Sequence, residues 1–228
     1  MPRVDVAGLV YHAYNRGNAG GTIFVTQKDY AAFEDIITAA KERTGMRILA
    51  YCLMPNHWHF VLHPQEDGLL AKFFQWATLT HTQRWQVVRG QVGSGHIYQG
   101  PYKANVCEQE DAHFLRLVRY VERNALRAQM VTRAESWRWC SAWRRVYGSD
   151  EHKRLLASWP VPEPADYLEY LNAPHSEEEL AVIRTSIRRG RPYGRDPWVE
   201  QVVEEYALEA TVRSKGGQTR HEGTRYLR

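Results

Sequence analysis

The fold is decided by one stretch of the sequence, MRILAYCLMPNHWHFVLH at residues 46–63. Two mostly apolar runs, 46–53 and 57–63, have the length of strands, and Pro55-Asn56 between them is typical of a tight turn. The stretch therefore predicts a β-hairpin. Because side chains alternate between the two faces of a strand, Trp58 is expected to face the core, and the histidines on either side of it are expected to face away.

Patterns on both sides of the hairpin predict the rest of an α+β domain. Two more strands are expected at 9–14 and 102–107, and helices at 28–43, at 69–88 and from Asp111 onward. Thr26 caps the first of these helices and Gly45 closes it. The order β-α-β-β-α-β-α predicts a ferredoxin-like antiparallel sheet with helices packed on one face.

The character of the chain changes after residue 147. Residues 1–147 are expected to form one domain, and residues 148–228 a linker with a helical, basic C-terminal extension. Ser176, with Glu179 three residues later, forms a capping box that begins a helix in this extension. The expected parts of the extension are a Pro-rich linker at 159–164, helices at 176–189 and from Pro197, and disorder over the last dozen residues.

The charge of the chain is concentrated in one segment. The 228 residues carry a net charge of +4, yet ten Lys/Arg against four Asp/Glu lie between Arg116 and Arg154. Tyrosines and tryptophans share this segment, and basic groups with aromatic faces suit single-stranded nucleic acid. The alternative is a solvated basic face over tryptophans that pack in the core.

Cysteine content and hydropathy limit the cellular compartment. The three cysteines have no close pairing, which is typical of buried thiols in a reducing compartment. No stretch approaches the ~20 apolar residues that a membrane span needs. The N-terminus lacks the basic start and apolar run of a secretory signal. The protein is therefore expected to be cytoplasmic, with no membrane partner.

His57 and His59 share one face of their predicted strand. Their Cα atoms are expected roughly 7 Å apart, given the ~3.3 Å rise per residue. Two imidazoles on a rigid strand can bind a divalent ion if a third ligand comes from elsewhere. A pair of polar strand residues without a metal is the alternative, and the spacing alone favours it.

Tyr120 and Asn124 form a second candidate group, on the helix that begins at Asp111. A spacing of four residues places them on one edge of that helix, about 6 Å apart along its axis. Asn124 offers a carbonyl oxygen to a hard cation. Tyr120 is a poor nucleophile at its ordinary pKa near 10, and becomes a useful one beside a metal ion and basic residues. The alternative is a tyrosine at the core boundary with a solvated hydroxyl.

The chain contains four stretches in a fixed order, YHAYNRGN at 11–18, MPNHWHF at 54–60, YVERNALRA at 120–128 and WRWCSA at 137–142. With the basic turn RGRP at 189–192, they resemble the motifs of the single-tyrosine HUH transposases. Within that superfamily, the chain looks most like the REP-associated tyrosine transposases (RAYTs) of bacteria. The resemblance covers roughly residues 9–147.

The resemblance implies an activity and the residues that carry it. It implies that His57 and His59 bind Mg²⁺ or Mn²⁺, that Asn124 is a third ligand and that Tyr120 is the nucleophile. The implied reaction nicks and rejoins single-stranded DNA at REP-type hairpins through a 5′-phosphotyrosine intermediate. The protein would then be a transposase, either mobile or domesticated.

Several further expectations concern the surroundings of this site. The family usually has proline where this chain has Ala125, so the helix is expected to run on and shift Asn124. His63 and His113 are additional histidines that could approach the site. The C-terminal extension could substitute for a partner subunit, which favours a monomer over a homodimer. The candidate DNA contacts are Arg16, Arg119, Arg123, Arg127, Arg138, Arg144, Arg145, Arg188, Arg189 and Arg191.

Two other functions are compatible with the sequence. One is a catalytically silent module that binds hairpin DNA or RNA, although such a module has no need of His57, His59 and Tyr120 together. The other is a small metallohydrolase in which the two histidines help to activate water. A hydrolase would keep cleaving after Tyr120→Phe, whereas a tyrosine nuclease would lose cleavage and keep binding.

Overall fold

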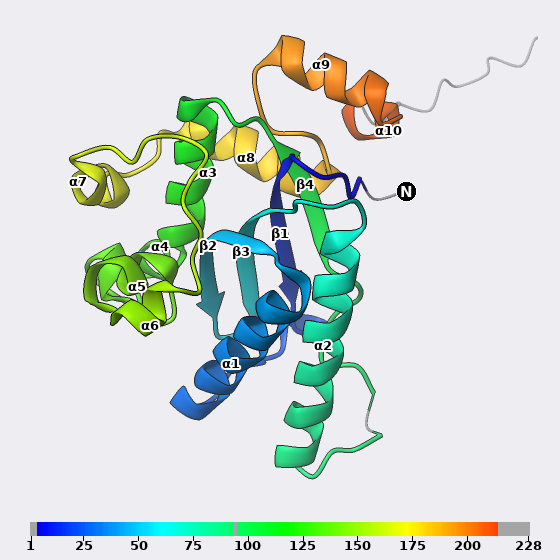
Figure 1. Cartoon of the computed structure of the whole chain (residues 1–228), viewed down its shortest axis with the longest axis vertical. Helices are drawn as coiled ribbons and strands as arrows, with labels where there is room; N and C mark the ends of the chain where they lie inside the picture. Colours follow the sequence, from blue (N-terminus) through cyan, green and yellow to red (C-terminus); the bar gives the residue numbers. More distant parts are fainter. Residues whose placement is uncertain (1–3, 94, 214–228) are drawn as a thin grey trace, which may run out of the picture.

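The computed structural model describes residues 4–93 and 95–213, and its first seven elements follow the predicted order (Figure 1). The strands are β1 (Val10–Arg16), β2 (Arg47–Met54), β3 (His57–His63) and β4 (Lys103–Cys107). The helices among them are α1 (Gln27–Thr44), α2 (Leu69–Val88) and α3 (Asp111–Glu122). Thr26 and Asp29 form a capping box at the start of α1, and Gly45 ends it with a positive φ of 71°.

The four strands form one antiparallel sheet in the order β2-β3-β1-β4. This arrangement confirms the predicted α+β class and the ferredoxin-like order of elements. The pairing register places His59 of β3 opposite Tyr14 of β1, and Tyr14 opposite Lys103 of β4. One row of side chains therefore crosses three strands of the sheet.

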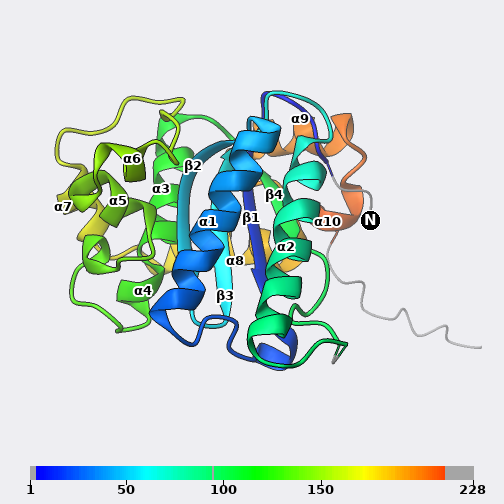
Figure 2. The same ribbon diagram turned by 60° about the horizontal axis from the view of Figure 1, so that its bottom comes forward.

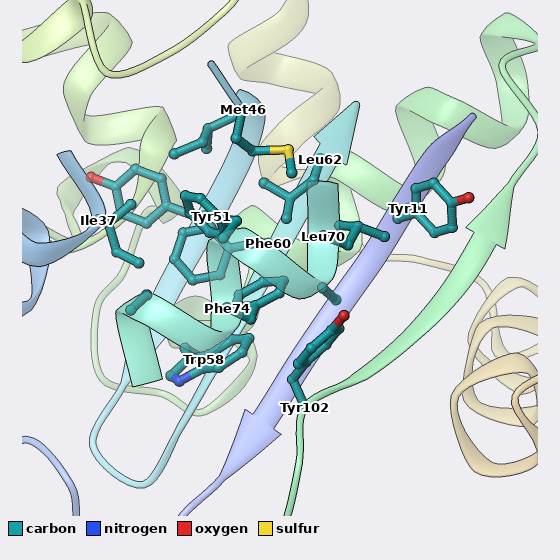
Figure 3. Close-up of a cluster of buried hydrophobic side chains, with 14 of the residues drawn as sticks. Tyr11, Ile37, Met46, Tyr51, Trp58, Phe60, Leu62, Leu70, Phe74 and Tyr102 are labelled. Carbon is teal, nitrogen blue, oxygen red and sulfur yellow. The ribbon is translucent and has the colours of Figure 1, made fainter. Parts of the chain in front are cut away.

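Helices α1 and α2 cover one face of the sheet, as Figure 2 shows. Trp58 of β3 stacks on Phe74 of α2 with ring centroids 5.0 Å apart, and Tyr51 and Phe60 lie in the same buried cluster (Figure 3). The predicted core-facing side of the hairpin is confirmed. Burial of such large rings is the main stabilising contribution of this layer.

The opposite face is covered by α3, which corrects the expectation that helices pack on one face only. The apolar stripe of α3, which includes Leu117 and Val121, packs against Leu49 of β2 and Val61 of β3. Strand β2 is buried along nearly its whole length. A strand that is apolar on both sides needs cover on both faces, and the unbroken apolar run of β2 already carried this signal.

The C-terminal extension packs on both sides of the sheet. The predicted helices at 176–189 and from Pro197 are confirmed as α8 and α9, and α8 begins with the predicted capping box. Leu180 and Ile183 of α8 belong to the hydrophobic cluster on the face of the sheet that α3 covers. Val199 and Val202 of α9 belong to the cluster on the face that α1 and α2 cover. The last dozen residues, predicted to be disordered, lie outside the described part of the chain. The helices after α3 are α4 (Asn124–Arg127), α5 (Ser141–Tyr147), α6 (Asp150–Lys153), α7 (Tyr167–Asn172), α8 (Glu177–Arg189), α9 (Asp196–Glu205) and α10 (Glu209–Val212).

A buried ionic network joins α1, β2 and α5. The hydroxyl of Tyr51 donates to Glu34 Oε1 at 2.5 Å, and a guanidinium nitrogen of Arg144 lies 2.7 Å from Glu34 Oε2. Arg144 also donates to the hydroxyl of Tyr51. All three residues are buried, and burial raises the pKa of Tyr51, so its hydroxyl stays protonated and can donate.

We expect Arg144→Met to lower the free energy of unfolding by about 3 kcal/mol, because it leaves the buried Glu34 carboxylate without its closest cation. Urea unfolding followed by circular dichroism measures the change. Arg84→Met, at an exposed position of α2, is the control and should stay within about 0.5 kcal/mol of the wild type. A loss of less than about 1 kcal/mol in Arg144→Met would mean that the network contributes little.

Candidate active site

His57 and His59 project from β3 on the face that α3 covers, opposite Trp58. Their ring centroids are 5.2 Å apart and their planes are nearly perpendicular, at 87°. Both rings line a hollow of about 370 Å³, together with Tyr14 and Arg16 of the neighbouring β1. His57 is half-buried and His59 is 7% exposed.

Both imidazoles use Nδ1 in a hydrogen bond. His57 Nδ1 lies 2.7 Å from Asn56 Oδ1 and must donate to it, because an amide oxygen only accepts. The lone pair of His57 is therefore on Nε2. His59 Nδ1 lies 2.9 Å from His12 Nε2, a contact that can orient the His59 ring in the same way. Two ring nitrogens are thus available for a ligand in the hollow.

Tyr120 of α3 lies over these histidines. Its ring centroid is 6.1 Å from that of His59 and 6.1 Å from that of His12, in edge-on geometry. No hydrogen bond of its hydroxyl to another described residue is present. The guanidinium of Arg127 lies 4.3 Å from the centre of the Tyr120 ring. The fold therefore brings the predicted nucleophile and the predicted ligands together.

Asn124 lies beside His57, as its predicted role requires. It is buried, its Oδ1 accepts a hydrogen bond from Arg127 at 2.7 Å, and its Nδ2 has no partner among the described residues. The prediction that the helix carrying Tyr120 runs on past Asn124 is confirmed only in part. Helix α3 ends at Glu122, and α4 begins at Asn124 after a single residue, Arg123, with φ −81° and ψ 2°. Burial lowers the pKa of His57, and a side-chain hydrogen bond to Asn124 as acceptor acts in the opposite direction.

Three residues of this site were missed by the sequence analysis: His12, Tyr14 and His175. The alternation in YHAY places His12 and Tyr14 on one face of β1, and the pairing with β3 brings them to His59. The alternation in the sequence therefore indicated that these two side chains share a face, but only the strand register shows that this face meets His59. His175 precedes α8, and its ring lies 6.2 Å from that of Tyr120. A single histidine in an irregular segment gives no such signal.

Tyr14 differs from Tyr120 in one important respect. Its ring lies 5.9 Å from the His59 ring, slightly closer than the Tyr120 ring at 6.1 Å. Its hydroxyl, however, donates to the Ile187 carbonyl at 2.6 Å, and burial raises its pKa to about 12. The Tyr14 proton is therefore held, whereas the Tyr120 hydroxyl is available.

Burial keeps the imidazoles of this site uncharged at neutral pH. It lowers the pKa of His57 to about 4, with a further contribution from Arg16, and that of His12 to about 3. The pKa of His59 is lowered well below its ordinary value by the same cause. Neutral imidazole is the form that binds metal ions. Among the described residues no cluster of three His, Cys, Asp or Glu side chains could hold a metal, so further ligands must be amide, water or phosphate oxygens.

Three of the arginines predicted to contact DNA are used inside the protein instead. Arg144 belongs to the network with Glu34, and Arg119 lies 2.6 Å from Glu179 of α8. Arg145 donates to the Leu49 carbonyl at 2.5 Å. Their partners are far away in the sequence, so local charge density could not distinguish these structural arginines from exposed ones.

The other predicted arginines are more accessible. The guanidinium of Arg127 lies over the Tyr120 ring, and Arg123 is half-buried. Arg138 stacks on Trp143 at 4.0 Å. Arg191 pairs with Asp196 at 3.2 Å. The exposed members of the set are Arg16, Arg188 and Arg189.

The two additional histidines do not approach the site. His63 lies at the far end of β3, where its Nδ1 is 3.0 Å from Arg47. His113 lies in the first turn of α3, with its Nδ1 2.8 Å from Glu110. Sharing a strand face with His59 was insufficient for His63, because four residues along a strand separate two side chains by about 13 Å.

This arrangement can be compared with known protein families. A model for IS200-like transposases matches residues 5–124, which is more than half of the chain and includes His57, His59, Tyr120 and Asn124. The chain belongs to the IS200-like transposase family. The transposase also shares its fold with a REP-associated tyrosine transposase bound to a REP hairpin, at a TM-score of 0.52 and 15% identity. That match covers 64% of this chain and 84% of the other.

Other comparisons add less. A protein from Deinococcus radiodurans described as a transposase matches at a TM-score of 0.38 and 16% identity, over 57% of this chain and 91% of the other. No curated protein sequence gives a significant match. Within residues 4–93 and 95–213, no helix of the transposase combines the length and the apolar character of a membrane span.

The buried histidines predict that the metal-free transposase loses stability in acid. The pKa of His12 is about 3 in the folded protein against about 6.5 when unfolded, so between these values only the unfolded chain binds this proton. The free energy of unfolding should fall as the pH drops below about 6.5, by about 1.4 kcal/mol per pH unit for this group. Urea unfolding in EDTA at about pH 7.5, 6 and 5 should show this dependence, and His12→Gln should reduce it. An unchanged dependence in His12→Gln would contradict the assignment.

Proposed function

We propose that this transposase nicks and rejoins single-stranded DNA at REP-type hairpins through a covalent 5′-phosphotyrosine on Tyr120. The observation that carries the proposal is the position of the Tyr120 ring, 6.1 Å from the ring of His59, with its hydroxyl available. Membership of a transposase family supports DNA cleavage and joining as the reaction class. The choice of hairpin follows the similar structure, which holds a REP hairpin.

Mg²⁺ or Mn²⁺ is proposed as the cofactor, held by Nε2 of His57, by the free nitrogen of His59 and by Oδ1 of Asn124. The donor set fits such an ion, because both imidazoles are neutral and each is oriented through Nδ1. Asn124 Oδ1 accepts one hydrogen bond from Arg127 and keeps a second lone pair. When bound, the ion would polarise a phosphoryl oxygen and align the phosphate for in-line attack.

The reaction itself needs few groups from the protein. Tyr120 Oη loses its proton and attacks phosphorus, the P–O3′ bond breaks, and the leaving oxygen takes a proton to become a 3′-hydroxyl. The 5′-phosphate stays on Tyr120. The guanidinium of Arg127, over the Tyr120 ring, favours the developing phenolate. Rejoining reverses these steps, because the covalent bond conserves the energy of the phosphodiester.

We expect wild-type transposase to form a covalent protein–DNA band with a labelled single-stranded hairpin oligonucleotide and Mn²⁺ on a denaturing gel. Tyr120→Phe should abolish the band, because phenylalanine has no nucleophilic oxygen, and it should keep DNA binding. His57→Ala should lower the yield of adduct by at least about a hundredfold, since it removes a metal ligand.

Tyr14→Phe is the matched control for Tyr120→Phe, since among the described residues it removes the other tyrosine hydroxyl next to His59. It should retain the adduct. Cleavage without an adduct in Tyr120→Phe would favour a metallohydrolase. Binding without cleavage by the wild type, across a panel of hairpins, would favour the silent binding module.

We expect His12→Leu to weaken the binding of Mn²⁺ by roughly 10- to 100-fold, because His12 holds the His59 ring through its Nδ1. Titration of the DNA-free protein, followed by electron paramagnetic resonance of free Mn²⁺, measures the affinity. His63→Ala, on the same face of β3 but away from the site, should leave it unchanged. Equal affinity in His12→Leu and wild type would show that His12 plays no part in the metal site.

A further inference from the structure

A groove continues from the candidate active site to the C-terminal extension. Three hollows of about 370, 460 and 400 Å³ share their lining residues. Tyr14 lines all three, Arg16 lines the first two, and Lys103 lines the last two. Because adjacent hollows share lining residues, they lie in a row on the surface, here called the β4 groove. It begins at His57 and His59 and passes across the ends of β1 and β4.

The strand register explains the course of the β4 groove. His59, Tyr14 and Lys103 are cross-strand neighbours on β3, β1 and β4. Strands lie about 4.8 Å apart, so Lys103 is about 10 Å from His59 along this row. All three side chains point to the same face, because directly opposed residues in a sheet share a face.

The far wall of the β4 groove is built by the extension. The end of α8, including Arg188 and Arg189, lines it together with Leu208 and Thr211 from the α10 region, and Figure 1 shows α8 and α10 beside β4. Several hydrogen bonds hold this wall to the sheet, among them one from the Tyr14 hydroxyl to the Ile187 carbonyl and one from Asn105 Nδ2 to Ser186 Oγ at 2.9 Å. The wall lies outside residues 5–124, which match the transposase family.

The charge of the β4 groove is of one sign. Lys103, Arg16, Arg188 and Arg189 are exposed and form no ion pair with a described residue. No Asp or Glu occurs among the described residues that line the three hollows. Four unpaired cations along a path that starts at the proposed cleavage site suit a chain of phosphates. The Tyr14 ring and Pro101 add apolar surfaces of the kind on which unpaired bases rest.

We propose that the β4 groove binds the single-stranded DNA that flanks the scissile phosphate, with Lys103, Arg188 and Arg189 in contact with its phosphates. The inference rests on the proposed function, because it takes His57 and His59 as the position of that phosphate. Each hollow has the size of a small-molecule site, about 300–1,000 Å³, which suits single nucleotides in succession. The extension thereby contributes to substrate binding.

The test is fluorescence anisotropy with two labelled probes, an oligothymidylate of about twelve nucleotides and a blunt hairpin without unpaired ends. The groove variant carries Lys103→Ala, Arg188→Ala and Arg189→Ala. The control variant carries Lys28→Ala, Lys72→Ala and Arg84→Ala, exposed positions of α1 and α2 with the same change in charge. No metal or cleavage is needed, so the result does not depend on Tyr120.

We expect the groove variant to bind the oligothymidylate roughly tenfold more weakly and to lower the slope of log K against log salt by about 2. Hairpin binding should change little, and the control variant should resemble the wild type. Equal losses in both variants, or an equal loss on the blunt hairpin, would overturn the proposal. If the wild type forms no tyrosine adduct but the groove variant still loses only single-strand binding, then the groove stands and the proposed chemistry fails.

Discussion

The antiparallel pairing of β1 with β3 is the constraint on which the candidate site depends. It sets Tyr14 beside His59 and Arg16 beside His57. A slip of one residue would exchange the faces of a whole strand, and would bring Trp58 out of the core, where it stacks on Phe74. The apolar side of the hairpin therefore holds the polar side in register, and the geometry of the histidines follows from the packing of a tryptophan.

The cover that α3 provides gives this face its chemical character. Burial of His12 and His59 keeps both imidazoles neutral, so no charge is buried there. The hydrogen bond between the two rings satisfies one polar nitrogen of each. The same helix brings Tyr120 over them, and α4, which follows after one residue, carries Arg127. Neutral imidazoles with cations at the border of the site are compatible with the metal ion and phosphate diester proposed above.

The C-terminal extension is bound to the site by several independent contacts. Glu179 pairs with Arg119 of α3, His175 contacts Tyr120, and the Ile187 carbonyl of α8 accepts a hydrogen bond from the Tyr14 hydroxyl. Helix α3 is thus held from both sides, by the sheet and by the extension. Loss of the extension would expose the Tyr14 hydroxyl and leave the buried cation of Arg119 unpaired, so stability and function are linked at this point.

Much of this protein was determined by local sequence. The hairpin at residues 46–63, the ends of α1 and the capping box of α8 depend on neighbouring residues, and alternation alone placed His57 and His59 on one face. The similarity to known transposases drew attention to Tyr120, and its role stays a prediction. Only the tertiary structure decided that α3 covers the second face and that Arg144 pairs with Glu34. Periodicity records which side of an element is apolar, whereas the partner of a buried polar group is set by packing between segments that are distant in the chain.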